Sequence, residues 1–509
     1  MSPRLTRRRA AMAVASAAVL GTALFSGTAT AATSAEPVST PVPIITPDGM
    51  LMSYIVNAKA ANPGQTRLVE RAVVAAGGVV VQSWPEIGVV VAHSDRAAFR
   101  TNVAAGGGNA VESVGATRTV AVSEGTPEEA GASWGRGASG YKQGAKKDYN
   151  GDLPGAQTPA AATDPDEAAQ WDMVQIKADQ AHKITDGSRS VLVGVLDSGI
   201  VPDHPDLKPN IDVPNSVNCT DAGRPDLSPT GWNYSPGGVS AYHGTHVAGT
   251  IAAARNGIGI VGVAPNVRIA SVKVTNYDGF IYPEYAVCGF VWAGLKHMDV
   301  TNSSYYIDPF MYYCEDQPDQ YAAKEAVRRA VNWSTGQGVV HAAAAGNAAT
   351  DLTNNTFDTT SPDDSTPVTR TINSGCHDIP TELDGVATVS ATTQATALAS
   401  FSNRGLGVID VAAPGRRVLS TLPKDVAPTG YGLLSGTSMA SPHVAGVLAL
   451  MKSAHPTWTP AQMLQRLEAQ ADDHPCAAPE NNVGAACVGA PSENSYYGEG
   501  IADALDAVS

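Results

Sequence analysis

The chain of 509 residues is poor in charged side chains, which make up 16% of it against about 25% in an average soluble domain. Positive charge is the scarcer sign, because 33 Lys and Arg stand against 48 Asp and Glu and leave a net charge of −15. An acidic balance of this size argues against a nucleic-acid partner and against binding to an anionic membrane. Six cysteines are too few for a scaffold held together mainly by disulfides, although their even number allows three bridges.

Long apolar runs are also missing, since after the N-terminus no stretch of about 18 uninterrupted apolar residues occurs. We therefore expect no membrane anchor. The first ten residues carry four arginines, residues 11–25 are apolar, and residues 29–31 read Ala-Thr-Ala. This pattern is typical of a secretory signal, and the apolar run is shorter than the roughly 20 residues that an N-terminal anchor needs. The sequence thus predicts a signal peptide at 1–31 and a secreted, extracellular protein.

Residues 50–122 predict a small α+β unit. Strand-like segments at 52–56, 78–84, 87–92 and 118–122 alternate with amphipathic segments at 66–75 and 96–105. Residues 123–168 are rich in Gly, Ala, Thr, Pro and Asp, and they are predicted to be a linker open to proteolysis. A second rigid domain there is the alternative, but this stretch lacks the apolar periodicity that builds a core.

From residue 171 onward, apolar strands alternate with helices. The predicted strands are residues 191–196, 268–274, 300–306, 339–345, 386–391 and 408–412, and the predicted helices are 243–254, 283–298, 320–335, 437–454 and 460–471. Thr459 before Pro460 is a good N-cap for the last helix. Strands that are apolar throughout indicate a mainly parallel sheet covered by helices on both faces, and such sheets bind ligands beyond the carboxyl ends of their strands.

Three residues with complementary chemistry follow these strands or begin these helices: Asp197, His243 and Ser438. A serine hydroxyl is a weak nucleophile until a base takes its proton, and imidazole suits that task near neutral pH. A carboxylate holds the base in the right tautomer and stabilises the imidazolium. A serine at a helix N-terminus also has free backbone N–H groups beside it, which favour a developing oxyanion.

The segments around these residues resemble the motifs of the subtilisin-like serine proteases, the subtilases. The resemblance rests on GTSMASPHVAG at 436–446, YHGTHVA at 242–248 and VLDSG at 195–199, in the family's chain order, and extends from about residue 175 to the C-terminus. It implies a three-layer α/β peptidase domain at 169–509 that hydrolyses peptide bonds through an acyl-enzyme. It also implies that His243 is the base and that His246 packs inside. A non-catalytic secreted binding protein on the same fold is the alternative.

The resemblance implies further site residues. Asn347 occupies the position whose side-chain amide helps to bind the oxyanion, with a plain Gly-Asn turn as the alternative. Substrate would lie as an added strand beside residues 302–306 and 343–346, with Ser304, Ala344 and Gly346 in contact.

This chain departs from the family at Tyr305 and Tyr306, which stand where Leu and Gly are common, so cleavage specificity cannot be transferred. A tyrosine at the glycine position would narrow the groove unless the backbone is rearranged. The acidic run at 351–364 would favour basic substrates, but a solvated loop is the preferred interpretation.

Many subtilases bind structural calcium, and Asp206 and Asn256 match two of its ligand positions, with Gln170 a further candidate. The alternative is ordinary turn chemistry. Catalysis itself implies no cofactor, and no His/Cys cluster suggests zinc. The six cysteines all lie after residue 200 and allow 15 pairings, of which Cys476–Cys487 is preferred, with Cys288 free and buried as a competing possibility.

Residues 50–122 more loosely resemble the subtilase propeptide, so residues 32–122 are predicted to assist folding and to block the groove of an autoprocessed zymogen. A large parallel sheet with many non-local contacts folds slowly, which gives a kinetic reason for such help. The expected partners are therefore protein or peptide substrates and the chain's own propeptide, and the mature enzyme is expected to be a monomer.

Overall fold

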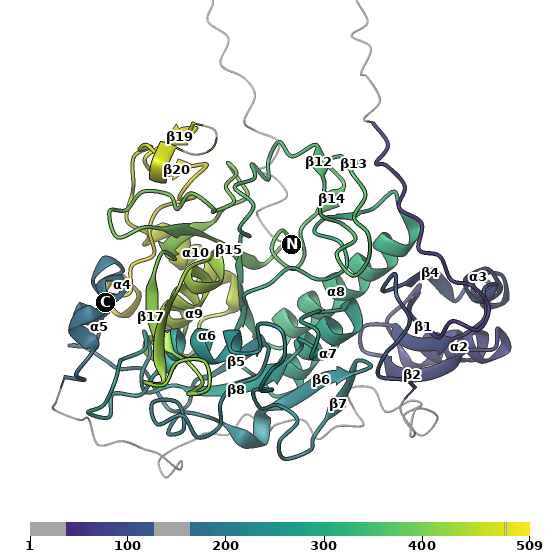
Figure 1. The fold of residues 1–509 in the computed structure, drawn as a ribbon, viewed down its shortest axis with the longest axis horizontal. Helices are drawn as coiled ribbons and strands as arrows, with labels where there is room; N and C mark the ends of the chain where they lie inside the picture. Colours follow the sequence, from purple (N-terminus) through teal and green to yellow (C-terminus); the bar gives the residue numbers. More distant parts are fainter. Residues whose placement is uncertain (1–36, 127–162, 483, 485) are drawn as a thin grey trace, which may run out of the picture.

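The structure is a computed structural model that describes residues 37–126, 163–482, 484 and 486–509 (Figure 1). The predicted signal peptide at 1–31 and most of the predicted linker at 123–168 lie outside the described residues. Among the described residues, no helix combines the length and the apolar character needed to cross a membrane.

An eight-stranded sheet forms the centre of the larger part, in the order β16-β15-β11-β9-β5-β8-β6-β7. Its strands are β5 (Leu192–Asp197), β6 (Val217–Asp221), β7 (Arg224–Asp226), β8 (Arg268–Lys273), β9 (Val300–Ser303), β11 (Val340–Ala344), β15 (Val386–Thr392) and β16 (Val411–Pro414). Neighbouring strands run parallel except for β6 and β7. The predicted, mainly parallel sheet is therefore confirmed.

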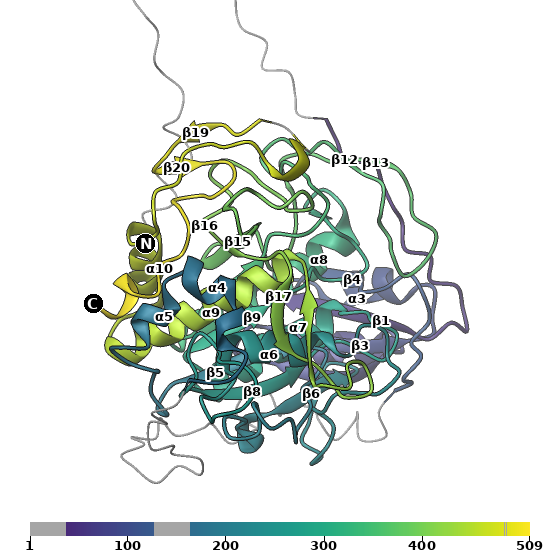
Figure 2. The same cartoon turned by 60° about the vertical axis from the view of Figure 1, so that its left-hand side comes forward.

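Helices cover both faces of this sheet and make three layers (Figures 1 and 2). One face packs against α6 (His243–Ala252), α9 (Thr437–Ala454) and α10 (Pro460–Ala469), and the other against α7 (Pro283–Leu295) and α8 (Pro318–Gly336). In β5, Val193 and Val195 join the core under α6 and α9, whereas Leu196 joins the core under α7 and α8. Burial on both faces explains why the strands are apolar throughout. Thr459 caps α10 as predicted, in a capping box with Gln462.

A smaller unit precedes this domain and packs against α7 and α8, at the right of Figure 1. Its elements are β1 (Met52–Ala58), α2 (Pro63–Ala75), β2 (Val79–Trp84), β3 (Val89–Ser94), α3 (Phe99–Gly107) and β4 (Val111–Ala116). The four strands form an antiparallel sheet in the order β2-β3-β1-β4. We call residues 52–126 the N-terminal unit.

The final strand predicted at 118–122 is wrong, because the last strand of the N-terminal unit is β4. Tertiary contacts hold the segment after β4 instead: Arg118 is buried, Thr119 bonds the Asp364 side chain, and the Val122 N–H donates to Leu51. A pattern of alternating apolar residues does not indicate which distant side chains will bond such a segment.

Short elements complete the described part of the chain. They are α4 (Trp171–Gln175), α5 (Ala178–Ala181), the strand pairs β10 (Tyr313–Cys314) with β14 (Cys376–His377), β12 (Phe357–Asp358) with β13 (Arg370–Thr371), β17 (Val418–Thr421) with β18 (Tyr431–Leu434), and β19 (Gly489–Ala490) with β20 (Glu493–Asn494), and four 3₁₀ turns. The strand predicted at 300–306 ends at Ser303, and the residues that follow it line the cavity described next.

Candidate active site

Asp197 and His243 form a hydrogen-bonded pair at the carboxyl edge of the sheet. Asp197 ends β5, His243 begins α6, and the imidazole Nδ1 lies 2.9 and 3.0 Å from the two carboxylate oxygens. Gly244 permits this approach, because a Cβ there would lie 2.5 Å from the Gly199 carbonyl and 3.1 Å from the Asp197 side chain. Burial disfavours the imidazolium, but the Asp197 carboxylate outweighs it, so the pKa of His243 is raised above its ordinary value. The pair thus combines an imidazole with a carboxylate that holds the ring by hydrogen bonding to Nδ1.

His246, on the next turn of the same helix, has a different environment. It is fully buried, and its Nε2 lies 3.2 Å from the carbonyls of Val418 and Gly432. Burial, helped by the nearby His243, lowers the pKa of His246 to about 3. The imidazole is therefore neutral and packed, and it lies away from the cavity.

Ser438 is the second residue of α9 and lies in the same cavity as Asp197 and His243. Its hydroxyl donates to the Ser304 carbonyl at 3.1 Å, and the Ser304 hydroxyl donates to the Ser438 carbonyl at 2.9 Å. Pro442 explains the second bond, because it has no N–H to offer the carbonyl four residues earlier in the helix. In this structure the hydroxyl of Ser438 bonds Ser304 and not the imidazole. The hydroxyl and the imidazole of His243 line the same cavity.

Asn347 follows β11 and is fixed by the first turn of α9. Its Oδ1 accepts the Thr437 N–H at 2.8 Å and the Thr437 hydroxyl at 3.0 Å, and that hydroxyl accepts the Gly346 N–H at 3.0 Å. Since the carbonyl side of the amide is engaged, the NH₂ side remains as a donor group in the cavity that Asn347 lines.

All of the predicted substrate contacts line one cavity of about 380 Å³ together with Asp197, His243 and Ser438. Ser304, Ala344 and Gly346 form part of its wall. Gly346 has a φ of +97°, and a Cβ there would lie 2.4 Å from the Asn403 amide, so only glycine fits. Tyr306 also lines the cavity and donates its hydroxyl to Asp363 at 2.6 Å.

The acidic run at 351–364 is not the solvated loop that we expected. Asp358 is buried against Arg370 at 2.6 Å, Asp363 accepts the Tyr306 hydroxyl, and Asp364 accepts the Thr119 N–H at 2.8 Å. These three carboxylates are therefore engaged with other side chains or backbone groups, and the Asp363 bond holds Tyr306, a residue of the cavity wall.

Two carboxylates in the cavity were not identified from the sequence: Asp308 and Asp378. Burial, followed by the neighbouring Asp363 carboxylate, holds the pKa of Asp308 well above its ordinary value. Burial, followed by the nearby Glu382 carboxylate, does the same for Asp378. Both residues belong to irregular segments joined by the Cys314–Cys376 disulfide, and no local motif marks them.

The two predicted calcium ligands do lie together, with the Asn256 amide 3.2 Å from the Asp206 carboxylate. However, Asp206 also accepts the Ile260 N–H at 3.1 Å and the Tyr431 hydroxyl at 2.9 Å, and Gln170 bonds both backbone groups of Val261. Calcium needs several oxygens that face it without competing donors. The side chains as arranged do not fit a bound cation, and calcium at this position stays a prediction.

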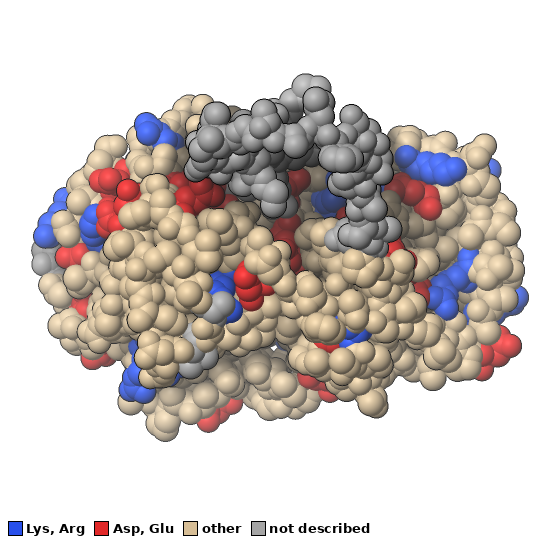
Figure 3. Space-filling model, turned by 90° about the horizontal axis from the view of Figure 1, so that it is seen from above, with Lys and Arg blue, Asp and Glu red and all other residues tan. Residues whose placement is uncertain are grey.

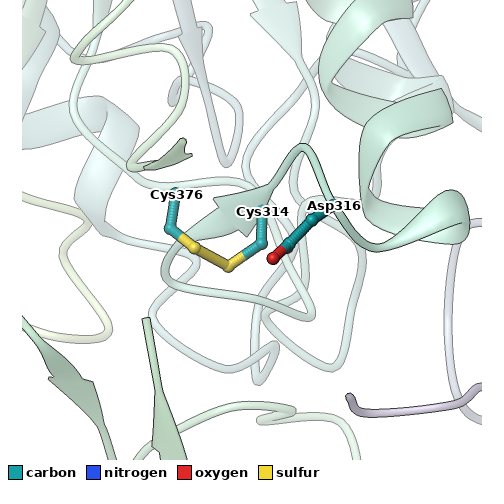
Figure 4. Close-up of side chains that lie close together, drawn as sticks. All are labelled: Cys314, Asp316 and Cys376. Atoms are coloured by element: carbon teal, nitrogen blue, oxygen red, sulfur yellow. A yellow bond between two sulfur atoms is a disulfide. The ribbon is translucent and has the colours of Figure 1, made fainter. Parts of the chain in front are cut away.

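Cys314, Asp316 and Cys376 are the one group among the described residues whose ligand atoms lie close enough for a metal (Figure 4). The two sulfurs are joined in a disulfide, and Asp316 accepts the Ser39 N–H at 2.8 Å. A metal site needs free thiolates, so this cluster is structural.

All six cysteines are paired, as Cys219–Cys288, Cys314–Cys376 and Cys476–Cys487. The preferred pairing of Cys476 with Cys487 is present. The competing possibility of a free Cys288 is wrong, because α7 presents it to Cys219 at the end of the sheet.

Comparisons with known proteins agree with this geometry. The model of the Subtilase family matches residues 188–498. The subtilisin of Bacillus pumilus is 36% identical over 305 residues, which cover 60% of this chain and 92% of that protein. Subtilisin E of Bacillus subtilis (strain 168) is also 36% identical over 305 residues, which cover 60% of this chain and 66% of subtilisin E.

Solved structures show the same fold. The epidermin leader peptide processing serine protease of Staphylococcus aureus has a TM-score of 0.61 at 20% identity, covering 90% of this chain and 98% of that one. Fervidolysin of Fervidobacterium pennivorans has a TM-score of 0.60 at 23% identity, covering 91% of this chain and 61% of that one. The chain therefore belongs to the subtilase family and is a serine endopeptidase.

Proposed function

We propose that this enzyme cleaves peptide bonds with Ser438 as nucleophile, His243 as general base and Asp197 as the group that orients the base. The observation that carries the proposal is the Asp197–His243 hydrogen bond in a cavity that Ser438 also lines. Because Asp197 binds Nδ1, the other ring nitrogen, Nε2, is the one that faces a proton donor.

The first half of the reaction follows from these positions. The Ser438 hydroxyl turns from Ser304 to His243, gives its proton to Nε2, and its oxygen forms a bond to the substrate carbonyl carbon. The imidazolium, stabilised by Asp197, then donates that proton to the departing amine nitrogen as the C–N bond breaks. An acyl-enzyme remains on Ser438. In the second half, water gives a proton to His243 as its oxygen forms a bond to the acyl carbon. The ester bond to Ser438 then breaks, the imidazolium returns the proton to the Ser438 oxygen, and the carboxylic acid is released.

Asn347 is proposed to bind the negative oxygen that forms during the attack. Its NH₂ group faces the cavity because Thr437 occupies its carbonyl oxygen. The backbone N–H of Ser438 at the start of α9 is the second donor. Removing one such donor typically costs about 100–1,000-fold in rate.

Residues 32–122, which include most of the N-terminal unit, are proposed to be a propeptide that assists folding and inhibits the enzyme. Buried contacts attach it to the helices behind the cavity: Arg118 pairs with Glu284 of α7 and lies 3.9 Å from the ring centre of Tyr282. Tyr282 adjoins Ile281, which lines the cavity. The unit thus anchors beside the substrate groove, and cleavage within 123–168 would release it. We further propose that the signal peptide at 1–31 directs export and that the chain folds as a zymogen. The proposed domain limits are those predicted from the sequence: the signal peptide at 1–31, the propeptide at 32–122, the linker at 123–168 and the peptidase domain at 169–509.

A fluorophosphonate probe tests the proposed chemistry, because it modifies only an activated serine. The purified enzyme should be labelled at Ser438, and Ser438→Ala and His243→Ala should abolish labelling. A folded mature chain that stays unlabelled would instead favour the alternative of a non-catalytic binding protein. N-terminal sequencing of the secreted protein tests both the signal peptide and the site of maturation.

A further inference from the structure

Asp378 is a buried carboxylate that lies in the cavity without a positive partner. It is 2% exposed, and its Oδ1 has no hydrogen-bond partner. Leaving such a group unpaired is costly, so native proteins rarely do so without a functional reason. No Lys or Arg of the described chain lines the cavity, whereas Asp197, Asp308 and Asp378 do.

The position of Asp378 places it beside the segment proposed to bind substrate. A Cβ on Gly346 would lie 3.8 Å from Asp378 Oδ2, so the carboxylate faces the space that the missing side chain leaves. The Asp378 N–H donates to Glu382 at 2.7 Å, and the Thr381 hydroxyl donates to the Ala344 carbonyl at 2.9 Å. These bonds hold the loop that carries Asp378 against the end of β11.

The remaining walls of the cavity complement a long side chain with an apolar stem. Ala344, Ala348, Met311 and Ile281 contribute apolar surface to the same cavity. Lysine and arginine combine an alkyl stem with a charged head, and they bind well where apolar walls end at a carboxylate. Figure 3 shows Asp and Glu side chains and Lys and Arg side chains interspersed over the face seen from above, so the charge that selects a substrate is local to the cavity and not a property of the whole face.

We infer that Asp378 is a specificity-determining residue that selects substrates with a lysine or arginine side chain on the acyl side of the cleaved bond. The inference rests on the proposed function, because it places that side chain by the nucleophile Ser438. Pairing with the cation supplies the partner that Asp378 lacks in the free enzyme.

The test uses mature enzyme and quenched peptides that differ at one position, carrying Lys, Arg or norleucine, the last having an alkyl chain and no charge. The wild type should show a kcat/KM about 10–100-fold higher for Lys and Arg, the range expected of a charge-assisted hydrogen bond. Asp378→Asn should lose this preference, because the amide carries no charge to pair with the cation, and its kcat/KM values for the Lys, Arg and norleucine peptides should become similar. Asp351→Asn is the matched control, because it removes a nearby carboxylate that does not line the cavity, and it should keep the preference.

Labelling by fluorophosphonate separates the possible failures. A wild-type enzyme that is labelled yet cleaves norleucine and lysine peptides equally well overturns the inference and leaves the proposed function intact. An unlabelled, inactive enzyme overturns the proposed function itself. A preference that survives Asp378→Asn overturns the assignment to this residue. If that variant does not fold, inhibition of the wild-type enzyme by small competitors tests the inference. Positively charged benzamidine should inhibit cleavage of the lysine peptide, and uncharged benzamide should not. Equal inhibition by the two compounds overturns the inference.

Discussion

Two buried ionisable side chains differ in how they are paired. In the cavity, Asp378 has no cation among the described residues that line it, and its Oδ1 has no hydrogen-bond partner. Under the N-terminal unit, the Arg118 guanidinium pairs with the carboxylates of Glu124 and Glu284 and bonds Tyr285. A buried ionisable group without an opposite charge costs stability, and a substrate can supply the missing partner. We therefore expect changes in the cavity to alter rates, and changes in the paired clusters to alter stability and docking.

The largest effect is expected from Ser438→Ala, which removes the proposed nucleophile and should lower kcat about 10⁶-fold. The variant should fold, because the Ser438 carbonyl still accepts the Ser304 hydroxyl. Its precursor should stay uncleaved within 123–168, as gel electrophoresis and mass spectrometry would show. Normal maturation of the pure variant would mean that another protease performs this cleavage.

Asp197→Asn should lower kcat/KM about 10⁴-fold and also move the acid limb of the pH profile. The pKa of His243 is raised in the wild type, and only the neutral imidazole acts as base. Activity should thus fall as the pH drops through a value above the ordinary pKa of about 6.5. Without the carboxylate, burial dominates and the limb should move to lower pH. If kcat/KM falls but the acid limb of the pH profile stays in place, Asp197 does not raise the pKa of the base and its role is structural.

Asn347→Ala should lower kcat about 100–1,000-fold with little change in KM, because the lost donor acts mainly in the transition state. The side chain is exposed, and the substitution removes only its two bonds to Thr437, so the midpoint of thermal unfolding should fall slightly. The matched control is Asn403→Ala, whose amide bonds the Ala345 carbonyl at 2.8 Å and supports the same strand. It should lower stability more than Asn347→Ala does, and the opposite order would break the comparison.

Arg118→Ala should loosen the N-terminal unit, because it leaves Glu284 buried without its cation at a cost of about 3–5 kcal/mol. Full-length protein that also carries Ser438→Ala avoids processing during the measurement. Hydrogen exchange in β1 and β4 should become faster. Adding Glu284→Gln should restore much of the protection, and faster exchange in this combined variant would mean that the pair does not act as a unit.

The smallest effect is expected from Tyr431→Phe, which removes one donor from Asp206 and should lower the free energy of unfolding by about 1–2 kcal/mol. Turnover should not change. Tyr234→Phe removes an exposed hydroxyl bond to Asp425 and should cost less than about 0.5 kcal/mol. Added calcium should not restore the free energy of unfolding that Tyr431→Phe loses. If calcium does restore it, the oxygens around Asp206 bind a cation.

The sequence alone predicted the layered sheet, which the structure confirms, and it supplied the proposed chemistry of the site. Apolar strands alternating with helices determine a parallel sheet buried on both faces, and long motifs identify Asp197, His243 and Ser438 because each motif keeps its residue at a strand end or a helix start. Local propensity also placed most helices within a few residues and identified the Thr459 cap.

Only the tertiary structure decided which distant polar groups meet. The disulfide partners of Cys288 and Cys314, the donors around Asp206 and the place of Asp378 in the cavity all depend on segments that lie far apart in the chain and meet only in the fold. A sequence pattern records the period of a helix or strand, but it does not record which side chains from separate loops come together. For that physical reason the reaction could be inferred from motifs, while the proposed specificity required the folded cavity.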